Sequence, residues 1–388
     1  MPSTRYLIVG GGMTGHAAAA AIREADPGGT LAMISGERHP PYARPPLSKG
    51  LWAGKPRESV FLPEVEGLVR HPGRRAVALV HREHALRDDR GEEHRYERLL
   101  LATGGRPRRL AVGGDRVVYF RTLDDYDRLR ASGRSAVVIG GGFIGTEIAA
   151  ALATAGKEVT MVFPESAIGA RSYPADLARF VTSYYERRGV RVLADRSVSG
   201  VDEAGARTLV RTTRGDALRA DAVVAGLGIE PETAVAEAAG IACDNGILVD
   251  AGLRTSAPDV WAAGDVARFD SAALGERIRV EHEDAALTMG RAAGRAMAGE
   301  AVRWTHLPFF YSDLFDLGYE AVGKLDARLE TVASWKAEHR EGAVYYLDRG
   351  RVVGVLLWGI FGRVEAARAL IERQVAPSRG ELASAIPV

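Results

Sequence analysis

The sequence predicts an α/β fold in which two parallel-sheet domains, each opened by a βαβ unit, are followed by a C-terminal α+β domain. A glycine-rich segment occurs twice, as GGGMTG at 10–15 and as GGGFIG at 140–145. Each copy follows an apolar, strand-like run and fits the spacing G-x-G-x-x-G. This spacing lets a strand turn tightly into a helix whose N-terminus faces a pyrophosphate. The fold class is therefore α/β, with two Rossmann-like dinucleotide-binding domains plus a C-terminal α+β domain.

The composition excludes several classes of function. The chain has 388 residues, 46% of them hydrophobic, and a formal net charge of +1. Cys243 is the single cysteine, which excludes an intrachain disulfide and a redox-active Cys-x-x-Cys pair. The first strand begins near Arg5, which leaves no room for a signal peptide, and the longest apolar run, 352–361, is too short to span a bilayer. We therefore expect a cytoplasmic protein with no nucleic-acid and no membrane partner.

The first domain opens with a strand, a helix and a second strand. We predict these elements over Leu7–Val9, Ala17–Ala25 and Leu31–Ile34. A proline-stiffened loop follows at 39–49 and can hold side chains in place with little entropy to lose. Alternating apolar residues over 74–100 then predict an antiparallel meander.

The second domain repeats the βαβ pattern over 136–163, and another apolar strand follows within 221–228. After Asp250 the sequence resumes the character of the first domain, so we expect one dinucleotide domain to be inserted into the other. From about Thr305 aromatic residues become frequent, and alternating strands precede a helix that begins near Arg363. The predicted boundaries are 1–114 with 230–304 for the first domain, 115–229 for the second and 305–388 for the third.

Two further motifs make the pattern specific. They are LLATGGRP at 100–107 and VWAAGDV at 260–266. With both glycine fingerprints, they give the chain a resemblance over nearly its whole length to the flavoprotein family that includes glutathione reductase and the ferredoxin reductases. The resemblance implies a glutathione-reductase-like fold, FAD in the first domain and NADH (NAD) in the second. The missing cysteine pair excludes the disulfide-reducing branch.

Other segments distinguish between the remaining branches. The loop PYARPPLSK at 41–49 resembles both the ferredoxin and rubredoxin reductases and apoptosis-inducing factor, whereas VEHEDA at 280–285 and FYSDL at 310–314 resemble the latter. This implies an apoptosis-inducing-factor-like NADH oxidoreductase, in which hydride passes from NADH to flavin N5. Electrons then leave to an external acceptor, which is a ferredoxin, a quinone or oxygen.

Two alternative functions and one assembly state stay open. The chain is either this NADH oxidoreductase, a ferredoxin or rubredoxin reductase that feeds a monooxygenase, or a redox-gated NADH-binding protein with slow turnover. A homodimer fits the redox-gated NADH-binding protein. The resemblance to apoptosis-inducing factor implies a protein whose oligomeric state changes when NADH binds.

The FAD site is predicted first from the fingerprint glycines. Gly10, Gly12 and Gly15 cradle the pyrophosphate, and an acid about twenty residues further on holds the ribose hydroxyls. Glu37 is the candidate acid, although it is also a plausible solvated loop residue. The resemblance implies further FAD contacts from Arg44, Lys49, Val77, Ala102, Thr103, Gly104, Arg121, Gly264, Asp265, Glu281 and His282.

The NADH site is predicted from the second fingerprint. Gly140, Gly142 and Gly145 receive the dinucleotide, and the resemblance adds Ile144 and Gly228. Glu165 follows Gly145 by about twenty residues, where a carboxylate accepts hydrogen bonds from a free 2′-hydroxyl and repels a 2′-phosphate. This favours NADH over NADPH, although Arg171 could reach a phosphate.

The resemblance also implies the residues that act on the reacting atoms. Lys49 and Glu147 lie beside flavin N5 and the nicotinamide, where fixed charge tunes the flavin. Phe143 is either an aromatic lid that moves to admit nicotinamide or a core aromatic. Glu147 could also be a first-turn acid stabilised by the helix dipole. His282, with Glu281, meets the flavin pyrimidine edge and the nicotinamide carboxamide.

We predict no metal site. His81, His84 and His94 fall in a polar meander without a supporting cysteine. The arginines at 106, 108 and 109 form either a solvated face or a docking patch for an acidic ferredoxin.

Overall fold

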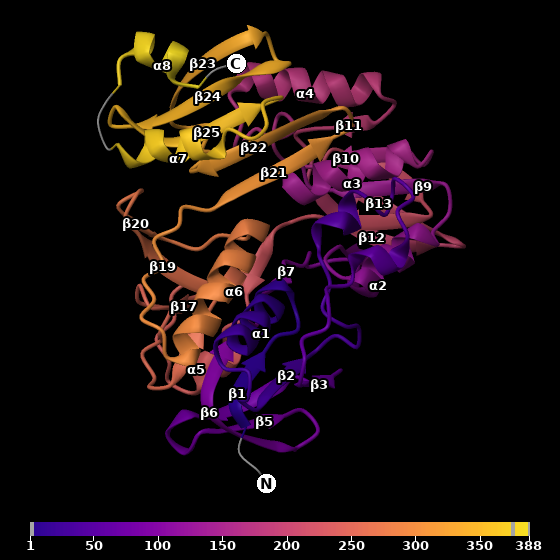
Figure 1. Cartoon of the computed structure of the whole chain (residues 1–388). Helices are drawn as coiled ribbons and strands as arrows, with labels where there is room; N and C mark the ends of the chain where they lie inside the picture. Colours follow the sequence, from indigo (N-terminus) through magenta and orange to yellow (C-terminus); the bar gives the residue numbers. More distant parts are fainter. Residues whose placement is uncertain (1–3, 374–376, 387–388) are drawn as a thin grey trace. The chain divides into compact units, whose positions relative to one another are not determined.

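The computed structural model describes residues 4–373 and 377–386 (Figure 1). The chain forms two compact units. The first unit consists of 1–43, 58–106 and 230–308, and the second of 44–57, 107–229 and 309–388.

The first unit is built on a mixed sheet with the strand order β3-β2-β1-β6-β5-β4. The expected βαβ unit is present as β1 (Thr4–Val9), α1 (Met13–Ala25) and β2 (Leu31–Ser35). β1 pairs with β2 in parallel, and Leu7 and Ile8 are fully buried. Such a strand, apolar on both faces, is typical of a sheet covered on both sides.

The expected meander is also confirmed, and it leads back into the parallel part of the sheet. β4 (Ala76–Val80), β5 (Ala85–Asp88) and β6 (Glu93–Leu101) pair antiparallel in succession. β6 then runs parallel to β1 and to β18 (Val260–Ala262), which comes from a distant part of the chain. The carboxyl ends of β1, β6 and β18 therefore meet at one edge of the sheet.

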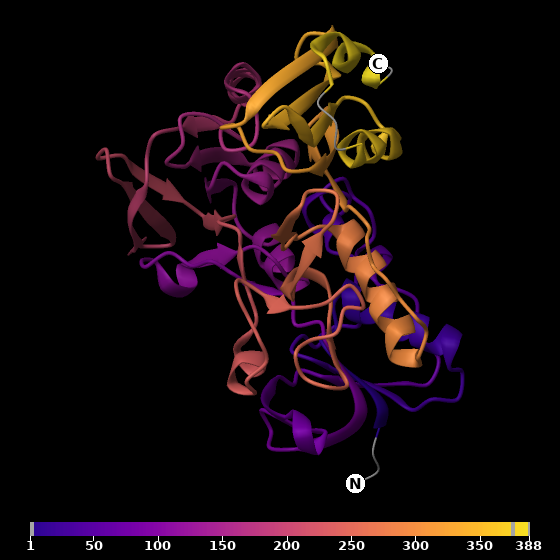
Figure 2. The same ribbon diagram turned by 90° about the vertical axis from the view of Figure 1, so that its left-hand side faces the viewer.

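Helix α6 (Glu283–Ala298) packs along α1, as both Figure 1 and Figure 2 show. The contact is close because α6 presents glycines to α1. A Cβ atom at Gly290 would lie 2.5 Å from the carbonyl oxygen of Thr14, and one at Gly294 would lie 2.5 Å from that of Ala18. The sequence after Asp250 thus supplies α6 to the first unit.

The second unit contains a parallel sheet of the order β11-β10-β9-β15-β8. The second βαβ unit is present as β9 (Ser135–Ile139), α3 (Phe143–Thr154) and β10 (Glu158–Val162). β15 (Ala222–Ala225) is the strand expected within 221–228, and it pairs in parallel with β9 and with β8 (Val117–Tyr119).

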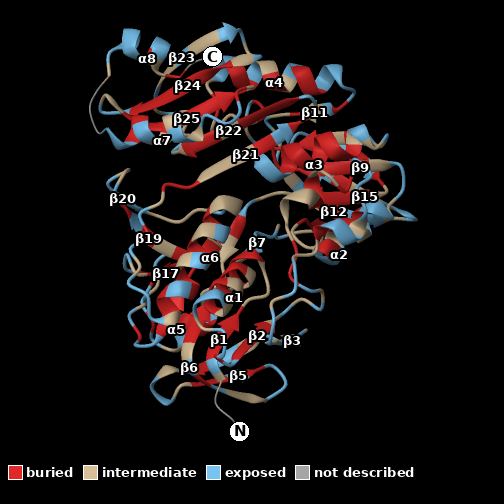
Figure 3. Cartoon of the chain, viewed as in Figure 1, coloured by how far each residue is buried: buried red, intermediate tan, exposed pale blue. Residues whose placement is uncertain are grey.

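An antiparallel sheet forms the C-terminal part of the second unit, with the order β21-β22-β25-β24-β23. Its central strands are deeply buried, and they appear red in Figure 3. The strands are β21 (Phe309–Leu314), β22 (Leu317–Gly323), β23 (Glu330–Ala337), β24 (Glu341–Asp348) and β25 (Arg351–Trp358). The helix expected from about Arg363 is α7 (Val364–Glu372), which packs on β22 and β25. The α/β class with a C-terminal α+β part is confirmed.

The remaining regular elements complete the two units. They are β3 (Leu68–Pro72), β7 (Gly105–Pro107), α2 (Leu123–Arg130), α4 (Ala175–Arg187), β11 (Arg191–Leu193), β12 (Val198–Ala204), β13 (Arg207–Thr212), β14 (Ala217–Ala220), β16 (Ile229–Pro231), α5 (Ala234–Ala238), β17 (Ile247–Leu248), β19 (Ala267–Ser271), β20 (Glu276–Ile278) and α8 (Arg379–Ala385), with short 3₁₀ turns η1 (Pro45–Ser48), η2 (Arg57–Val60), η3 (His81–Glu83), η4 (Gly114–Arg116) and η5 (Gly264–Val266). Within the described residues, every helix is too short or too polar to cross a bilayer.

Candidate active site

Three predicted FAD motifs meet at one edge of the first sheet. In the parallel register, Val9 lies opposite Leu101, and Leu101 lies opposite Ala262. The first fingerprint, the ATG segment at 102–104 and the GD pair at 264–265 each follow these strand ends. Ligands of open α/β sheets bind at such an edge.

The glycine loop after β1 has room only for glycine at two positions. A Cβ atom at Gly10 would lie 2.0 Å from the carbonyl oxygen of Ala102, and Gly10 has φ +123°. A Cβ atom at Gly15 would lie 2.0 Å from the carbonyl oxygen of Gly10. Gly12 caps α1 in an extended conformation and makes no side-chain cap hydrogen bond. These features fit a pyrophosphate at the N-terminus of α1.

The GD pair lies against the same helix. Gly264 has φ +76°, and a Cβ atom there would lie 2.3 Å from the hydroxyl of Thr14 in α1. Arg279 donates to the carbonyl oxygen of Asp265 at 3.0 Å and pairs with Glu281 at 2.9 Å. The predicted contacts Asp265 and Glu281 are therefore joined by one buried guanidinium.

His282 is the N-cap residue of α6. Burial lowers the pKa of His282 to about 4, and this outweighs the opposing effect of the Asp265 and Asp284 carboxylates. The imidazole is therefore neutral at pH 7. A neutral ring can donate one hydrogen bond and accept one, as a contact to a carboxamide or a flavin edge requires.

Three other predicted FAD contacts, Glu37, Thr103 and Val77, lie in different parts of the first unit. Glu37 follows β2, and its carboxylate accepts a hydrogen bond from the hydroxyl of Tyr42. Thr103 donates to the carbonyl oxygen of Glu232 at 2.7 Å, next to Gly104 with φ +67°. Val77 lies on the edge strand β4 and is 53% exposed. Strands β6 and β5 lie between β4 and β1 in the sheet, so Val77 is distant from the glycine loop that follows β1.

The second glycine loop has the same close packing but an open helix end. A Cβ atom at Gly140 would lie 2.4 Å from the carbonyl oxygen of Gly226, and one at Gly145 would lie 2.1 Å from that of Gly140. At Gly142, the N-cap of α3, such an atom would meet nothing within 4 Å. Phe143 and Ile144 follow, each 40% exposed. An open helix N-terminus flanked by exposed apolar side chains suits a dinucleotide.

The predicted ribose contact follows β10. The carboxylate of Glu165 pairs with the guanidinium of Arg171, whose side chain is 82% exposed. Gly228, with φ +80°, follows β15 on the same edge of the sheet. Glu165, the predicted contact for the ribose of NADH, and Arg171, the residue that could reach the 2′-phosphate of NADPH, therefore form an ion pair with each other.

Lys49 and Glu147 form an ion pair in the second unit. The side chains are 14% and 7% exposed, respectively. Ser48 donates to Oε2 of Glu147 at 2.6 Å, and Ser312 of β21 donates to Oε1 at 2.6 Å. A buried carboxylate needs such donors, because a buried ion pair is costly unless its remaining lone pairs are satisfied.

Strand β21 supplies further groups around the lysine. The Lys49 ammonium lies 5.3 Å from the ring centre of Tyr311 and 3.9 Å from the Asp313 carboxylate. Phe310 contacts Phe143 edge-on, with the ring centres 5.3 Å apart. The predicted lid Phe143 is therefore part of an aromatic contact at the partly exposed start of α3.

Arg44 and Arg121 are brought together by a hydrogen bond from the Arg44 side chain to the Arg121 backbone. Arg44 donates to the carbonyl oxygen of Arg121 at 2.8 Å. The Arg121 amide donates in turn to Asp125 at 3.0 Å, beside the capping box at Thr122 that starts α2. These contacts orient the Arg44 side chain and the Arg121 backbone. The assignment of both arginines as FAD contacts stays a prediction.

Ser48 and Ser312 are site residues that the sequence did not indicate. Ser48 immediately precedes Lys49, and Ser312 lies within the FYSDL segment that carried the resemblance. Neither spacing nor composition separates them from ordinary serines. Their role depends on pairings over 99 and 165 sequence positions, respectively.

One histidine of the meander, His94, takes part in a polar cluster. His94 lies with His71 and Glu92, and their potential ligand atoms are within 4.8 Å of one another. Arg74 bonds to Asp88 and Glu92, and His94 contacts Asp88 at 3.1 Å. Because a guanidinium already balances both carboxylates, we assign this cluster to the stability of the meander.

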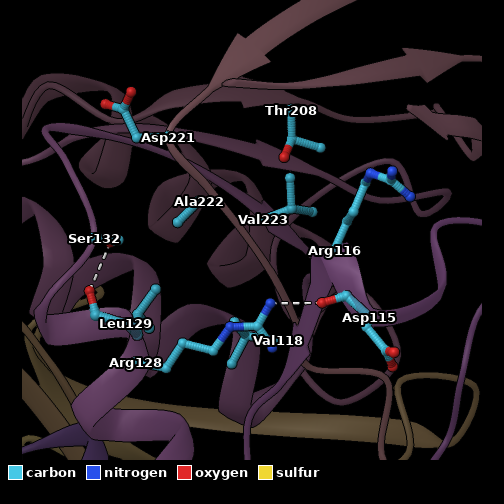
Figure 4. Close-up of a pocket in the computed structure, with 10 residues that line it drawn as sticks. All are labelled: Asp115, Arg116, Val118, Arg128, Leu129, Ser132, Thr208, Asp221, Ala222 and Val223. Atoms are coloured by element: carbon cyan, nitrogen blue, oxygen red, sulfur yellow. Dashed lines mark hydrogen bonds between the residues drawn. The ribbon is translucent and has the colours of Figure 1, made fainter. Parts of the chain in front are cut away.

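A cavity of about 500 Å³ lies in the second unit (Figure 4). It is found where β8 and β15 begin, whereas dinucleotide loops follow the ends of parallel strands. Two of its charged side chains already have partners. Arg128 donates to the carbonyl oxygen of Asp115 (Figure 4), and Asp221 accepts from Ser135 at 2.8 Å. The cavity is therefore separate from the candidate site.

Comparison with known proteins agrees with this geometry. A family model described as pyridine nucleotide-disulphide oxidoreductase matches residues 4–290. A second model, described as the C-terminal region of mitochondrion-associated apoptosis-inducing factor, matches 293–341 and 333–373. Together the two matches extend over most of the chain.

Individual relatives cover nearly the whole chain. Apoptosis-inducing factor 1, mitochondrial, of Dictyostelium discoideum is 31% identical over 95% of this chain and 78% of its own length. The 5,5'-dehydrodivanillate O-demethylase ferredoxin reductase subunit of Sphingobium sp. is 36% identical over 92% of this chain and 90% of its own. The solved covalent putidaredoxin reductase–putidaredoxin complex matches with a TM-score of 0.91 and 28% identity, over 99% and 96% of the two chains.

These matches confirm the predicted cofactors and enzyme class. Oxidoreductases of this type use FAD and NAD(H), and the relatives include ferredoxin reductases and a monodehydroascorbate reductase. The single cysteine excludes an intrachain disulfide from the electron path of this chain. The chain belongs to the pyridine nucleotide-disulphide oxidoreductase family.

Proposed function

We propose that this protein oxidises NADH and delivers the electrons to a one-electron carrier protein of the ferredoxin type. The observation that carries the proposal is the buried Lys49–Glu147 ion pair, which two serine hydroxyls hold close to the open N-terminus of α3. FAD, when bound, supplies the chemistry: it accepts a hydride from the nicotinamide and releases electrons to the external acceptor.

The residues of the chain bind and orient the reactants. The N-termini of α1 and α3, with their glycine loops, receive the two pyrophosphates. Glu165 holds the ribose hydroxyls of NADH and disfavours the 2′-phosphate of NADPH, while the neutral His282 and Glu281 lie beside the GD pair that binds the flavin. Lys49 and Glu147 place fixed charges at the reacting centre, and such preorganised charge lowers the barrier to charge transfer.

Support for a ferredoxin-type acceptor comes from the relatives. Two of the most similar proteins are ferredoxin reductase components, and one matching structure holds a reductase with its putidaredoxin. An acidic carrier could dock on the arginines at 106, 108 and 109. Quinone and oxygen are the competing acceptors. We further propose a cytoplasmic protein that forms a homodimer.

Anaerobic stopped-flow spectroscopy tests the proposal. The purified yellow protein is mixed with NADH or NADPH and then, in a second mixing step, with air, a quinone, or a [2Fe–2S] ferredoxin plus cytochrome c. We expect fast reduction by NADH and prompt cytochrome reduction that depends on the ferredoxin. The absence of bound FAD, or of reduction by NADH, would refute the proposal.

A second function is favoured by the C-terminal match to apoptosis-inducing factor. In that case the protein is a redox-gated NADH-binding protein with slow turnover. NADH would then reduce the protein, electron release to every acceptor would be slow, and a sizing column would show an NADH-dependent change from monomer to dimer. Prompt electron release without any change in association would exclude this candidate.

A further inference from the structure

We propose that Ser312 is a positioning residue for the reaction with NADH and that it acts through Glu147. Its hydroxyl would fix the carboxylate, and thereby the Lys49 ammonium, relative to the nicotinamide. This inference rests on the proposed function and assigns to the C-terminal sheet a part in the NADH half of the reaction.

The hydrogen bonds to Glu147 involve both carboxylate oxygens. Lys49 and Ser312 contact Oε1, and Ser48 contacts Oε2. A carboxylate that is held at both oxygens cannot rotate without breaking a bond to a charged or polar partner. Because Glu147, Ser48 and Ser312 are 6%, 8% and 1% exposed, water has little access to replace a lost donor.

The strand that carries Ser312 is itself rigidly supported. Ser312 lies opposite Tyr319 in the pairing of β21 with β22. The Tyr319 ring stacks on Trp358, with 5.6 Å between the ring centres and 11° between the planes, and contacts Tyr173 edge-on. Tyr319 and Trp358 are fully buried, so the backbone behind Ser312 has little freedom to move.

The same strand acts on Lys49 from a second side. Tyr311 and Asp313, the neighbours of Ser312, lie near the Lys49 ammonium. β21 also packs against α3, the helix that carries Glu147, and the two elements lie side by side in Figure 1. Three consecutive residues of the C-terminal sheet therefore help to position the Lys49–Glu147 pair. Small misplacements of catalytic groups have large effects on rate.

The decisive test compares Ser312→Thr with Ser312→Val in the FAD-bound protein. The two variants add the same bulk to the strand and differ in the hydroxyl alone. A hydrogen bond to a buried charge is costly to lose, so we expect the Val variant to reduce the limiting rate of anaerobic reduction by NADH about tenfold. The Thr variant should stay within about twofold of wild type, and the NADH half-saturation should change less than about threefold in both.

Matched controls separate this role from a general loss of structure. Ser334→Val on β23 removes a serine that donates to the carbonyl oxygen of Ala383, and it should leave the limiting rate unchanged. If Ser312→Val fails to fold, Ser312→Ala decides, since it removes the hydroxyl without added bulk: a slow limiting rate supports the inference, and a wild-type rate overturns it.

The outcomes also distinguish this inference from the proposed function. Equal limiting rates in the Thr and Val variants, with wild-type protein that NADH reduces quickly, overturn the role of Ser312 alone. A parallel loss of rate and NADH affinity in both variants overturns it as well, because bulk would then be the cause. Wild-type protein that NADH does not reduce overturns the proposed function and this inference together.

Discussion

The hydroxyl of Ser312 lies 2.6 Å from the carboxylate of Glu147, although 165 positions separate the two residues in the sequence. Together with Ser48 and Lys49, Ser312 saturates a carboxylate that is almost completely buried. A buried charge with this many partners is stable only as a group, so the consequences of removing one member can be predicted.

Replacing Glu147 by Gln removes the nearer of the two carboxylates beside the Lys49 ammonium and leaves only the more exposed Asp313 carboxylate, at 3.9 Å. Breaking a buried pair on one side costs several kcal/mol, and because Lys49 keeps some exposure we expect a loss of about 2 kcal/mol in the free energy of unfolding. The double variant Glu147→Gln/Lys49→Met removes both charges and should recover most of that loss. Urea unfolding of the FAD-bound protein measures both values.

Glu158→Gln is the matched control, since Glu158 is an exposed residue at the start of β10. We expect it to change the free energy of unfolding by less than about 0.5 kcal/mol. The single variant Lys49→Met completes the comparison. If the loss in the free energy of unfolding of the double variant equals the sum of the losses of the two single variants, the two side chains are not coupled. The ion pair is then not the reason for their burial.

Most of the fold was predictable because its signals are local. The two βαβ units were predicted to within a few residues, since an apolar strand, a glycine turn and a small-residue helix follow one another directly in the sequence. The meander was predictable for the same reason, from its period of two and its polar turns. The pairing of β6 with β18 was not, because it joins strands from distant parts of the chain.

The candidate site was predictable only in part. The fingerprint glycines can be recognised in the sequence because each position is defined by backbone geometry, such as the close approach of Gly10 to Ala102. Their assignment as cofactor contacts stays a prediction. Ser48 and Ser312 were missed because a serine shows its hydrogen-bond partner only after folding. The sequence also gave no sign that 44–57, with Lys49, would join the second unit.

Two glycines of the second fingerprint should respond differently to alanine. Gly140 has φ +114°, and a Cβ atom there would lie 2.4 Å from a carbonyl oxygen, so Gly140→Ala should destabilise the protein by about 2 kcal/mol or more. At Gly142 a Cβ atom would enter open space. Gly142→Ala should therefore leave the melting temperature unchanged and raise the KM for NADH about tenfold. An unchanged KM would show that the N-terminus of α3 is not the NADH site.

The contact between Glu165 and Arg171 predicts a change in nucleotide preference. Glu165→Ala removes the acceptor for the ribose hydroxyls and frees an exposed guanidinium for the 2′-phosphate. We expect the ratio of kcat/KM for NADPH to that for NADH to rise at least about tenfold, since a specific charge contact is gained as another is lost. The double variant with Arg171→Ala should lose the gain for NADPH and keep the loss for NADH. If the double variant retains the NADPH gain, another cation binds the phosphate.

His282 predicts how stability depends on pH. Burial lowers the pKa of His282 from its ordinary value of 6.5 to about 4 in the folded protein. Between these values the unfolded chain binds a proton that the folded chain does not, so the stability from the neutral ring is complete above about pH 6.5 and is lost as the pH falls towards 4.

Asn at position 282 cannot titrate, so the free energy of unfolding of His282→Asn should fall less steeply between pH 6.5 and pH 4. The difference in the free energy of unfolding between the two proteins should reach about 3 kcal/mol by pH 4. The two curves should run parallel above pH 7, which serves as the internal control. Equal slopes between pH 4 and 6.5 would mean that the ring is accessible to protons, and the case for a neutral His282 at the flavin edge would then fail.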